Sequence, residues 1–403
     1  MRIIAWGSYD VSKPRVRLLL SELRKQDAVQ AEINMPVWNS IRDKAVAGPA
    51  RLLKALARLA ASYPRALVEL TRRSAGNAIL LPYPAIPDVF LAWPIAKLRK
   101  HRLIFDAFIP LHDTVVADRG LIRAGGLAAK LLWCIERWGL GLADLIIVDT
   151  DQHGDFFSRE FGIERERFQT ILVGAEPAFW EQRSARWPRQ QDQGASENLP
   201  TVLFYGQLIP LHGIDTILEA IQLTSSDPLR WLLIGSGQEE PKLRRFLQEH
   251  RGGNVTWVAW VNYQSLPRLI AKASIALGIF GTSDKAARVI PNKVFQILAT
   301  GTPLVTRSSP AMDELAKLYP DAILTVPAGD GAALADAVRQ GLDVARKWRA
   351  VPVNAEVALG PSEGVQCLLN CVSTLQGRYG GLSPADDFKA GQSDTPFVPN
   401  SAS

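Results

Sequence analysis

Short apolar runs alternate with helical stretches along most of the chain, and this alternation restricts the fold more than any other feature. The runs in the first half are RIIAW, NAILLPYP, HRLIFDAF and ADLIIVDT, and those in the second half are TVLFYG, RWLLIGSG, VTWVAW, SIALGIF and PLVTR. Strands that are joined through helices pair in parallel and are covered on both faces. The sequence therefore predicts an α/β fold with two Rossmann-like, doubly wound parallel sheets.

Breaks in this alternation indicate the domain organisation, and 403 residues suit two domains better than one core. The polar stretch 176–200 has no usable periodicity and is predicted to link an N-terminal domain of residues 1–175 to a C-terminal domain of residues 201–360. Residues 379–403 are rich in Gly, Pro, Ser and Asp, so we expect a disordered tail. Two such domains should face each other across a cleft, with ligands at the carboxyl ends of their strands.

Neither the N-terminus nor an internal segment indicates export or a bilayer span. MRIIAW leads directly into a strand without the features of a signal peptide. The most apolar region, residues 127–148, is interrupted by Lys130, Glu136, Arg137 and Asp144. Three cysteines are too few for a disulfide framework or a four-ligand zinc site. We therefore expect a cytoplasmic protein.

Positive charge is concentrated in residues 42–73, which hold eight Lys and Arg residues against Asp43 and Glu69. At about 100° per residue, one helical face carries Arg51, Lys54, Arg58, Arg65 and Arg72, and the roughly opposite face carries Leu52, Leu56, Leu59, Leu67 and Leu70. This pattern predicts a helix on an anionic membrane surface, so we expect a peripheral protein of the inner membrane face. The alternative is a surface helix whose leucines pack on the domain core. Nucleic acid is disfavoured because aromatic residues do not interleave with the basic ones.

Two glycine-containing turns in the second half suit a diphosphate. In FYGQLIPLHGID, the residues between the end of a strand and the start of a helix include Gly206, Gln207, His212 and Gly213. Backbone N–H groups at such a turn attract phosphate, although many α/β proteins have a similar turn. IGSG, with Gly235 and Gly237, permits close approach of a ligand, but Glu240 replaces the third glycine of a dinucleotide fingerprint. A nicotinamide cofactor is therefore disfavoured.

The segment RVIPNKVFQ predicts a second anion site at the start of a helix. Pro291 presets the helix start, Asn292 can cap it, and Lys293 adds a cation beside the positive end of the helix. Gln296, one turn further on, can bond a ribose hydroxyl. A capped helix that simply packs on a sheet is the alternative.

Loops after two predicted strands of the first half should face the same cleft. Their candidate residues are Gly7, Ser8 and Arg15 in GSYDVSKPR, and Asp106, His112 and Asp113 in DAFIPLHD. Arg15 can hold an acceptor phosphate, and Asp106, His112 or Asp113 can touch a sugar hydroxyl or a developing charge. For Arg15, an exposed side chain without a role is an equal alternative.

Several of these segments resemble the retaining glycosyltransferases of family four, which have the GT-B fold. FYGQLIPLHGIDTILEAI is similar to the phosphate loop of that family, RWLLIGSGQ to its strand and turn beside the nucleotide, and PNKVFQILATGTPLVT to its donor-binding helix. VTWVAWVNYQSLPRLIAKASIALGIFG resembles the base-side strand and following helix, which implies that Trp260 lies beside the nucleotide. The specific likeness is confined to residues 202–306. The resemblance also implies a helix near residues 361–377 that crosses back to the first domain.

The resemblance implies a hexosyltransferase that moves a sugar from a nucleoside diphosphate sugar to a lipid-linked or polysaccharide-precursor acceptor at the cytoplasmic membrane face. It implies no bound metal and no cofactor besides this co-substrate. Lys293, with Gln207, His212 and Arg288, would stabilise the departing diphosphate. The family's pair of glutamates falls on Arg288 and Gln296. A catalytically impaired nucleotide-sugar-binding homologue and a sugar-nucleotide epimerase of the same fold therefore stay open as alternatives.

Overall fold

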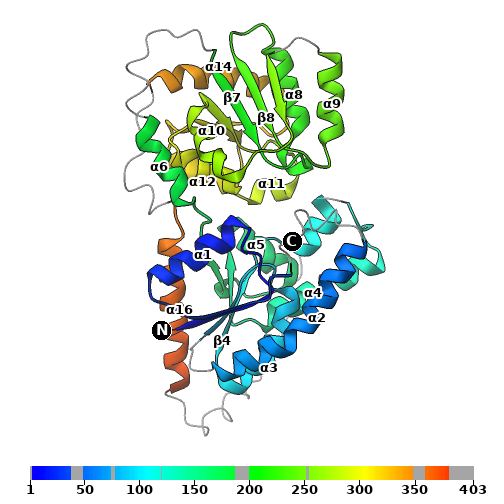
Figure 1. Ribbon diagram of the computed structural model, residues 1–403, viewed down its shortest axis with the longest axis vertical. Helices are drawn as coiled ribbons and strands as arrows, with labels where there is room; N and C mark the ends of the chain where they lie inside the picture. The colour runs from blue at the N-terminus through cyan, green and yellow to red at the C-terminus, as the bar shows by residue number, and fades with distance from the viewer. Residues whose placement is uncertain are drawn as a thin grey trace, which may run out of the picture.

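The computed structural model describes residues 2–37, 49–73, 78–118, 120–186, 199–250, 254–347 and 359–380. These residues form two α/β domains, one above the other along the long axis of the molecule (Figure 1). Each domain contains a six-stranded parallel sheet with helices on both faces. The predicted fold class, two doubly wound parallel-sheet domains, is confirmed.

The sheet of the N-terminal domain has the strand order β2-β1-β3-β4-β5-β6. Its strands are β1 (Ile3–Gly7), β2 (Val29–Asn34), β3 (Ala78–Leu81), β4 (Arg102–Asp106), β5 (Leu145–Val148) and β6 (Phe168–Thr170). Alternate side chains point to opposite faces, as the pleat requires. Ile4, Trp6 and Ile79 belong to the core under α2 (Pro49–Arg72), α3 (Ile86–Arg99), α4 (Leu127–Leu142) and α5 (Asp151–Phe161). Ile3, Ala5 and Leu80 belong to the core under α1 (Pro14–Lys25) and α16 (Ser362–Gly380).

The sheet of the C-terminal domain has the strand order β12-β11-β10-β7-β8-β9. Its strands are β7 (Thr201–Tyr205), β8 (Arg230–Ile234), β9 (Val255–Val258), β10 (Ile275–Leu277), β11 (Leu304–Arg307) and β12 (Ile323–Val326). One face packs on α6 (Pro177–Arg186), α10 (Leu266–Lys272), α12 (Asn292–Ala299) and α13 (Pro310–Leu318). The other face packs on α8 (Ile214–Leu223), α9 (Glu240–Glu249) and α14 (Gly331–Lys347). A short helix, α11 (Asp284–Arg288), follows β10.

The two segments that we expected outside the regular domains are partly helical. The stretch 176–200 contains α6, so the prediction of an irregular linker is wrong for this part. Phe179 is fully buried and Trp180 packs beside it on the core of the C-terminal domain, which stabilises the helix. Residues 187–198 and the predicted tail beyond residue 380 lie outside the described residues. The helix expected near residues 361–377 is α16, which packs on α1 and β6 of the N-terminal domain.

Helix α2 is the described part of the basic segment 42–73. Leu59 and Leu70 are buried and Leu67 packs partly against the core of the N-terminal domain, whereas Leu56 is 47% exposed. The alternative that the leucines pack on the domain core therefore holds for most of the described stripe. Arg42 and Lys44 lie outside the described residues, as do the side chains of Arg51 and Leu52.

The domains meet at the carboxyl ends of their strands. Thr150, directly after β5, donates its hydroxyl to the carbonyl oxygen of Arg288 at 2.6 Å. Gln152 donates to the carbonyl oxygen of Pro310 at 3.3 Å, and Lys285 donates to the hydroxyl of Thr114 at 2.8 Å. This is the edge where doubly wound sheets bind their ligands.

Candidate active site

The turn after β7 brings a glycine, a histidine and a lysine together. Gly206 has a φ of 143°, and a Cβ there would lie 2.9 Å from Cε1 of His212 and 3.1 Å from Nζ of Lys293. A side chain at this position would therefore displace both groups. With His212 and Lys293 in these positions, only glycine fits at residue 206. This turn is the segment in which the sequence predicts the phosphate loop.

Lys293 reaches this turn from the first turn of α12. Its side chain is buried, and Nζ donates to the carbonyl oxygen of Gly278 at 3.3 Å and lies 4.2 Å from the ring centroid of Phe204. Burial lowers the pKa of Lys293 to about 7, because the charged form has lost its hydration. An anion placed at this ammonium group would supply the missing counter-charge.

His212 is held as a neutral donor beside the lysine. Its Nδ1 bonds the carbonyl oxygen of Gln207, and its ring packs edge-on against Phe204. Burial, and then the charge of Lys293, keep the pKa of His212 well below its usual range. The imidazole therefore fixes the shape of the loop and leaves the positive charge to Lys293.

The remaining donor-side glycines pack closely against neighbouring backbone. A Cβ on Gly235 would overlap the carbonyl oxygen of Gly206, so only glycine fits between β7 and β8. Gly237 lies against Leu208, and Gly213 lies against Phe280. Trp260 follows β9 and is 63% exposed.

Two predictions about α12 need correction. The helix begins at Asn292 with Pro291 in the cap position, and no side-chain cap hydrogen bond forms, so Asn292 is not the cap. Gln296 uses both ends of its amide. Its Oε1 accepts from the hydroxyl of Tyr205 at 3.0 Å, and its Nε2 donates to the hydroxyl of Tyr263 at 2.9 Å. A ribose hydroxyl would have to compete with these tyrosines.

The tyrosine network continues into the N-terminal domain. The hydroxyl of Tyr263 donates to Glu176 at 2.7 Å, and Arg17 of α1 donates to the same carboxylate oxygen at 2.6 Å. The guanidinium of Arg17 also lies over the ring of Tyr263, 5.4 Å from its centroid. Gln296 therefore belongs to a chain of contacts that joins the two domains.

Four candidates on the acceptor side are structural in this state. Arg15 is buried, with Nη2 3.0 Å from Asp106 and Nη1 bonded to the carbonyl oxygen of Ile171. Both expectations for Arg15, an acceptor phosphate site and an exposed side chain without a role, are wrong. A cation this deeply buried requires a paired carboxylate, and Asp106 supplies it. Ser8 donates its backbone N–H and hydroxyl to Asp88, and a Cβ at Gly7 would lie 2.6 Å from that carboxylate.

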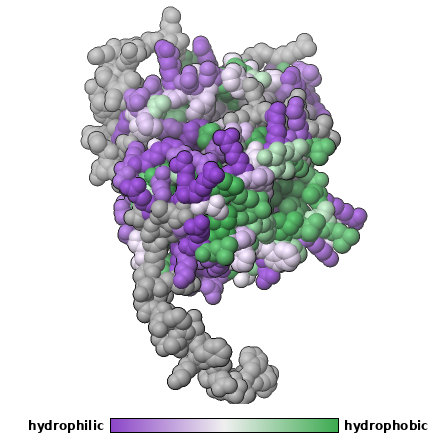
Figure 2. Space-filling model, turned by 60° about the horizontal axis from the view of Figure 1, so that its bottom comes forward, coloured by the Kyte–Doolittle hydropathy of each residue, from purple (hydrophilic) through white to green (hydrophobic). Residues whose placement is uncertain are grey.

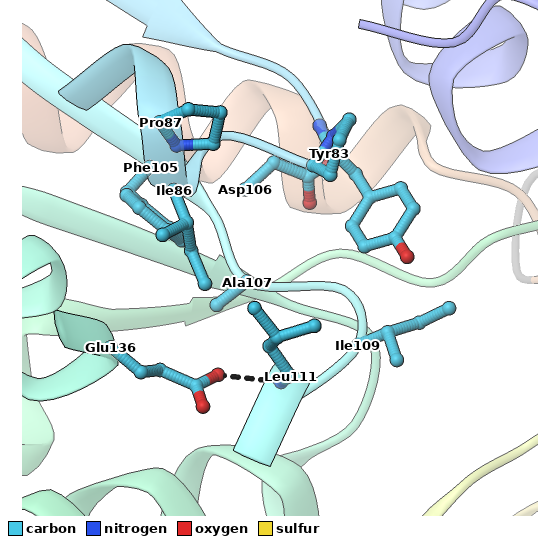
Figure 3. A pocket seen from close by; sticks show the side chains of 10 residues that line it. Tyr83, Ile86, Pro87, Phe105, Asp106, Ala107, Ile109, Leu111 and Glu136 are labelled. Carbon is cyan, nitrogen blue, oxygen red and sulfur yellow. Dashed lines mark hydrogen bonds between the residues drawn. The ribbon is translucent and has the colours of Figure 1, made fainter. Parts of the chain in front are cut away.

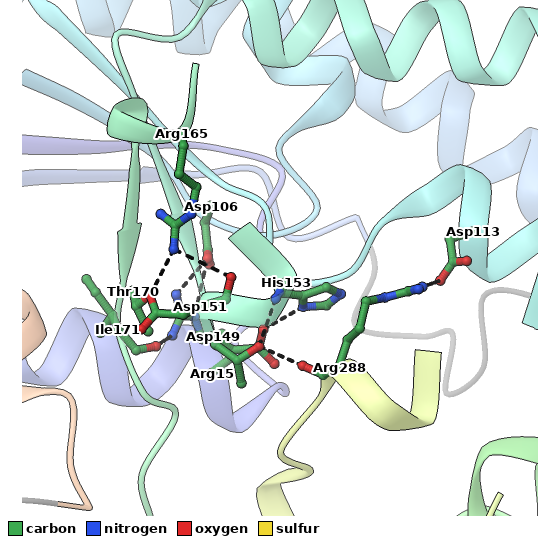
Figure 4. Close-up of polar contacts among 11 residues, drawn as sticks. Arg15, Asp106, Asp113, Asp149, Asp151, His153, Arg165, Thr170, Ile171 and Arg288 are labelled. Carbon is green, nitrogen blue, oxygen red and sulfur yellow. Dashed lines mark hydrogen bonds and ion pairs between the residues drawn. The ribbon is translucent and has the colours of Figure 1, made fainter. Parts of the chain in front are cut away.

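His112 and Asp113 lie where the N-terminal domain meets α11. Asp113 pairs with Nη2 of Arg288 at 3.2 Å (Figure 4). The guanidinium of Arg288 also lies 3.9 Å from the ring centroid of Phe156. Arg288 was expected at the diphosphate, yet in this state it is the charge that links the domains. His112 is half-buried and forms part of the wall of a pocket with Trp133.

Sequence reasoning missed the residue that holds this loop. Glu136 on α4 is buried, and its two carboxylate oxygens accept the backbone N–H groups of Leu111 and His112, both at 2.7 Å. Burial raises its pKa to about 7. A charged residue in the middle of an apolar helix was the available signal, but we interpreted it only as evidence against a membrane span.

A pocket of about 140 Å³ lies beside this loop, between the start of α3 and the end of β4 (Figure 3). Its apolar walls include Tyr83, Ile86, Pro87, Phe105 and Ile109. Asp106 and Glu136 are its acidic members. Mainly apolar walls with a few polar groups are typical of a binding pocket for a small group.

Comparisons with known proteins agree with this architecture. The crystal structure of HepE from Anabaena in complex with UDP covers 94% of this chain with a TM-score of 0.62 at 13% identity, and all of that chain is matched. Sucrose-phosphate synthase from Thermosynechococcus elongatus covers 94% of this chain and 98% of its own, with a TM-score of 0.63 at 16% identity. Two Rossmann-like domains that meet at the carboxyl ends of their strands define the GT-B class, and this chain has that fold.

The sequence matches are narrower, and the family model lies within the C-terminal half of the chain. Residues 199–343 match the family model for glycosyl transferases group 1. The putative colanic acid biosynthesis glycosyl transferase WcaI of Escherichia coli (strain K12) is 23% identical over 148 residues, which are 36% of each protein. The chain thus matches about a third of the length of this curated relative. The protein therefore has the GT-B fold, and the resemblance seen in the sequence is matched by the family model over residues 199–343.

The described residues contain neither a candidate metal site nor a candidate membrane span. Their His, Cys, Asp and Glu side chains form no group of three or more that could hold a metal ion. Among their helices, none is both long and apolar enough to cross a membrane.

Proposed function

We propose that this protein is a retaining glycosyltransferase that moves a sugar from a nucleoside diphosphate sugar to a lipid-linked or polysaccharide-precursor acceptor at the cytoplasmic face of the membrane. The observation that carries the proposal is the approach of Lys293 and His212 to Gly206. A buried lysine beside a glycine turn, near the amino end of α12, is a site for the diphosphate.

The donor pocket would stabilise the leaving group through charge that is already in place. The bond between the anomeric carbon and the diphosphate oxygen breaks, and the acceptor hydroxyl oxygen bonds to that carbon. The hydroxyl proton leaves with the nucleoside diphosphate. Lys293 opposes the charge that grows on the diphosphate, which is the main electrostatic demand of such a step. No bound metal is proposed. The HepE structures, named as complexes with UDP and with UDP-glucose, support a nucleotide sugar as the donor class.

The N-terminal domain would supply the acceptor side. His112 and Asp113 lie next to the domain junction, and the pocket beside them offers apolar walls to part of an acceptor. Polar contacts at the reacting hydroxyl and an apolar pocket nearby fit a lipid-linked acceptor better than a free sugar. The name of the Escherichia coli relative, in colanic acid biosynthesis, supports the polysaccharide-precursor class.

Membrane attraction would come in part from α2. Lys54, Arg58, Arg65 and Arg72 are exposed on this helix, and anionic headgroups attract each such residue by about 1 kcal/mol. Because most described leucines of α2 pack inward, this contribution is electrostatic.

A catalytically impaired nucleotide-sugar-binding homologue is the second candidate. The two positions of the family's glutamates hold Arg288 and Gln296, and both side chains are engaged in contacts that join the domains. Such a protein would bind the donor without transferring or hydrolysing the sugar.

A thermal-shift panel with UDP-, GDP- and ADP-sugars tests the donor site. We expect one class to raise the melting temperature of the wild type, and Lys293→Ala to lose that shift. Lys272→Ala, at an exposed lysine of the same domain, is the matched control and should keep it. An undiminished shift in Lys293→Ala would discredit the site. The protein is then incubated with the nucleotide sugar that gives the largest shift and with membrane lipid extract. Only a transferase forms a glycosylated product, so this step distinguishes it from the impaired homologue.

A further inference from the structure

Helix α4 is turned with its charge inward and its apolar side outward. Glu136 is buried against the loop after β4, whereas Leu127 is 87% exposed, Leu131 62% and Trp138 66%. Cys134 is also exposed. Surface helices normally have the reverse arrangement, with the apolar stripe against the core.

The exposed residues form one continuous stripe. At about 100° per residue, positions 127, 131, 134 and 138 fall within a sector of about 60°, roughly opposite Glu136. The eleven steps from residue 127 to residue 138, at about 1.5 Å each, make the stripe about 17 Å long. Lys130 and Arg137 are exposed along one border of the stripe.

Apolar surface continues from the stripe towards α3. Trp138 and Leu142 of α4 line a groove of about 620 Å³ together with Phe90, Trp93 and Pro94 of α3. At the far end of α3, Leu98 is 82% exposed. Figure 2 shows apolar side chains gathered over a broad part of one face of the molecule.

Basic residues accompany this surface. Lys97, Arg99 and Lys100 are exposed around Leu98, and Lys130 and Arg137 border the stripe. The acidic Glu160 contacts α4 from outside, where it accepts from the indole of Trp133 on a side of the helix away from the stripe. Leucine and tryptophan with a basic border complement the acyl boundary and anionic headgroups of a lipid leaflet.

We propose that α4 is the element that enters the lipid, with Leu127, Leu131 and Trp138 at the boundary between headgroups and acyl chains of an anionic bilayer. This inference rests on the proposed membrane location, and it assigns the apolar contact to α4 instead of α2. The groove against α3 then receives acyl chains, and the basic border contacts phosphate headgroups.

Co-sedimentation of the full chain with vesicles tests the inference. Vesicles of phosphatidylcholine with about one third phosphatidylglycerol are compared with pure phosphatidylcholine. We expect the wild type to bind the anionic vesicles, and Leu131→Glu to need at least about tenfold more lipid for half-maximal binding, because a leucine that enters the lipid is replaced by a charge. Leu318→Glu, at an exposed leucine on the C-terminal domain, is the matched control and should bind like the wild type.

A second readout locates the contact. Vesicles with brominated acyl chains should quench the fluorescence of the wild type, and Trp138→Phe should lose a large part of that quenching. The proposal would be overturned if Leu131→Glu bound the vesicles as tightly as the wild type. It would also be overturned if only a charge reversal in α2, such as Arg58→Glu, abolished binding. A wild-type dimer that Leu131→Glu converts to a monomer would also overturn it, because a second copy would then cover the stripe.

The donor site is measured separately in the same variants. Leu131→Glu should keep the wild-type melting temperature and nucleotide-sugar shift, which shows that the variant is folded. If the wild type fails to bind vesicles but keeps its nucleotide-sugar shift, the lipid contact is contradicted and the donor site is not. A nucleotide shift that is absent in the wild type contradicts the proposed donor site and leaves the lipid measurement unaffected.

Discussion

Lys293 lies beneath Gly206 with its ammonium group against the ring of Phe204. Burial is the cause of its lowered pKa of about 7, so the free protein holds this proton only partly at neutral pH. A bound diphosphate would raise the pKa again, because an opposite charge favours the protonated form. Binding of the donor should therefore take up a proton.

This proton uptake predicts a pH dependence of donor binding. The complex binds more protons than the free protein, so affinity is highest below about pH 7 and falls as the pH rises through that value, by up to about tenfold per unit. Calorimetric titration with the best nucleotide sugar between about pH 6 and pH 9 measures it. A nucleotide sugar is the suitable ligand because its diphosphate does not titrate in this range. Lys293→Gln should give weaker, pH-independent binding, and a flat wild-type profile would contradict the prediction.

The sequence could not predict the contacts of the site that join residues from distant segments of the chain. The donor-side glycines, His212 and Lys293 were correctly expected to be close, since each follows a strand or begins a helix in a recognisable segment. Arg15 was misplaced because its partner, Asp106, lies on a different strand and only the folded sheet brings them together. The same limit applies to Asp113, whose partner belongs to the other domain.

At the scale of elements, central strands were predicted and several edge strands were not. β1, β3, β4 and β5 are continuous apolar runs because both faces of a central parallel strand are buried. β2, β6 and β12 lie at sheet edges, and polar residues such as Gln30, Glu32 and Thr325 interrupt or shorten their apolar runs. Helix α6 was missed because Phe179 and Trp180 are too few to give a visible period, although they suffice to dock it.

Glu136 should contribute more to the free energy of unfolding than a charged residue on a surface helix usually does. At pH 5 the folded Glu136 side chain is a neutral carboxylic acid whose two oxygens can both face backbone N–H groups, whereas glutamine would place its NH2 group against one of them. Glu136→Gln should therefore lower the free energy of unfolding by about 1–3 kcal/mol at pH 5. Because the folded pKa of about 7 is above the unfolded value, the wild type loses stability as the pH rises from about 4.5 to 7. The difference between the two proteins should shrink accordingly by pH 8.

Urea denaturation at both pH values measures this difference. Glu164→Gln, at an exposed position of the same domain, is the control and should change little. A difference that grows with pH would contradict the assignment of the raised pKa to Glu136.

At the scale of the whole molecule, the ion pair between Arg288 and Asp113 holds the two domains together at the carboxyl ends of their strands. The side chains are mostly buried, and the stacking of Arg288 on Phe156 adds to the contact. In the proposed function a donor and an acceptor both enter between the domains, so this contact would open during turnover.

Arg288→Met should favour the open state, because it keeps the apolar stem and removes the charge that pairs with Asp113. Small-angle X-ray scattering of the ligand-free protein should give a larger radius of gyration for Arg288→Met than for the wild type. Arg230→Met, at an exposed arginine of β8, should leave the scattering unchanged. Identical profiles for all three proteins would show that the ion pair does not govern closure.

The inward orientation of Glu136 has a mechanical consequence. Its carboxylate ties the middle of α4 to Leu111 and His112, and the next residue along the chain, Asp113, pairs with Arg288 of the other domain. A displacement of α4 is therefore transmitted to the contact between the domains through three consecutive residues of backbone. A surface that binds α4 from outside would therefore also restrict the motion of the two domains relative to each other.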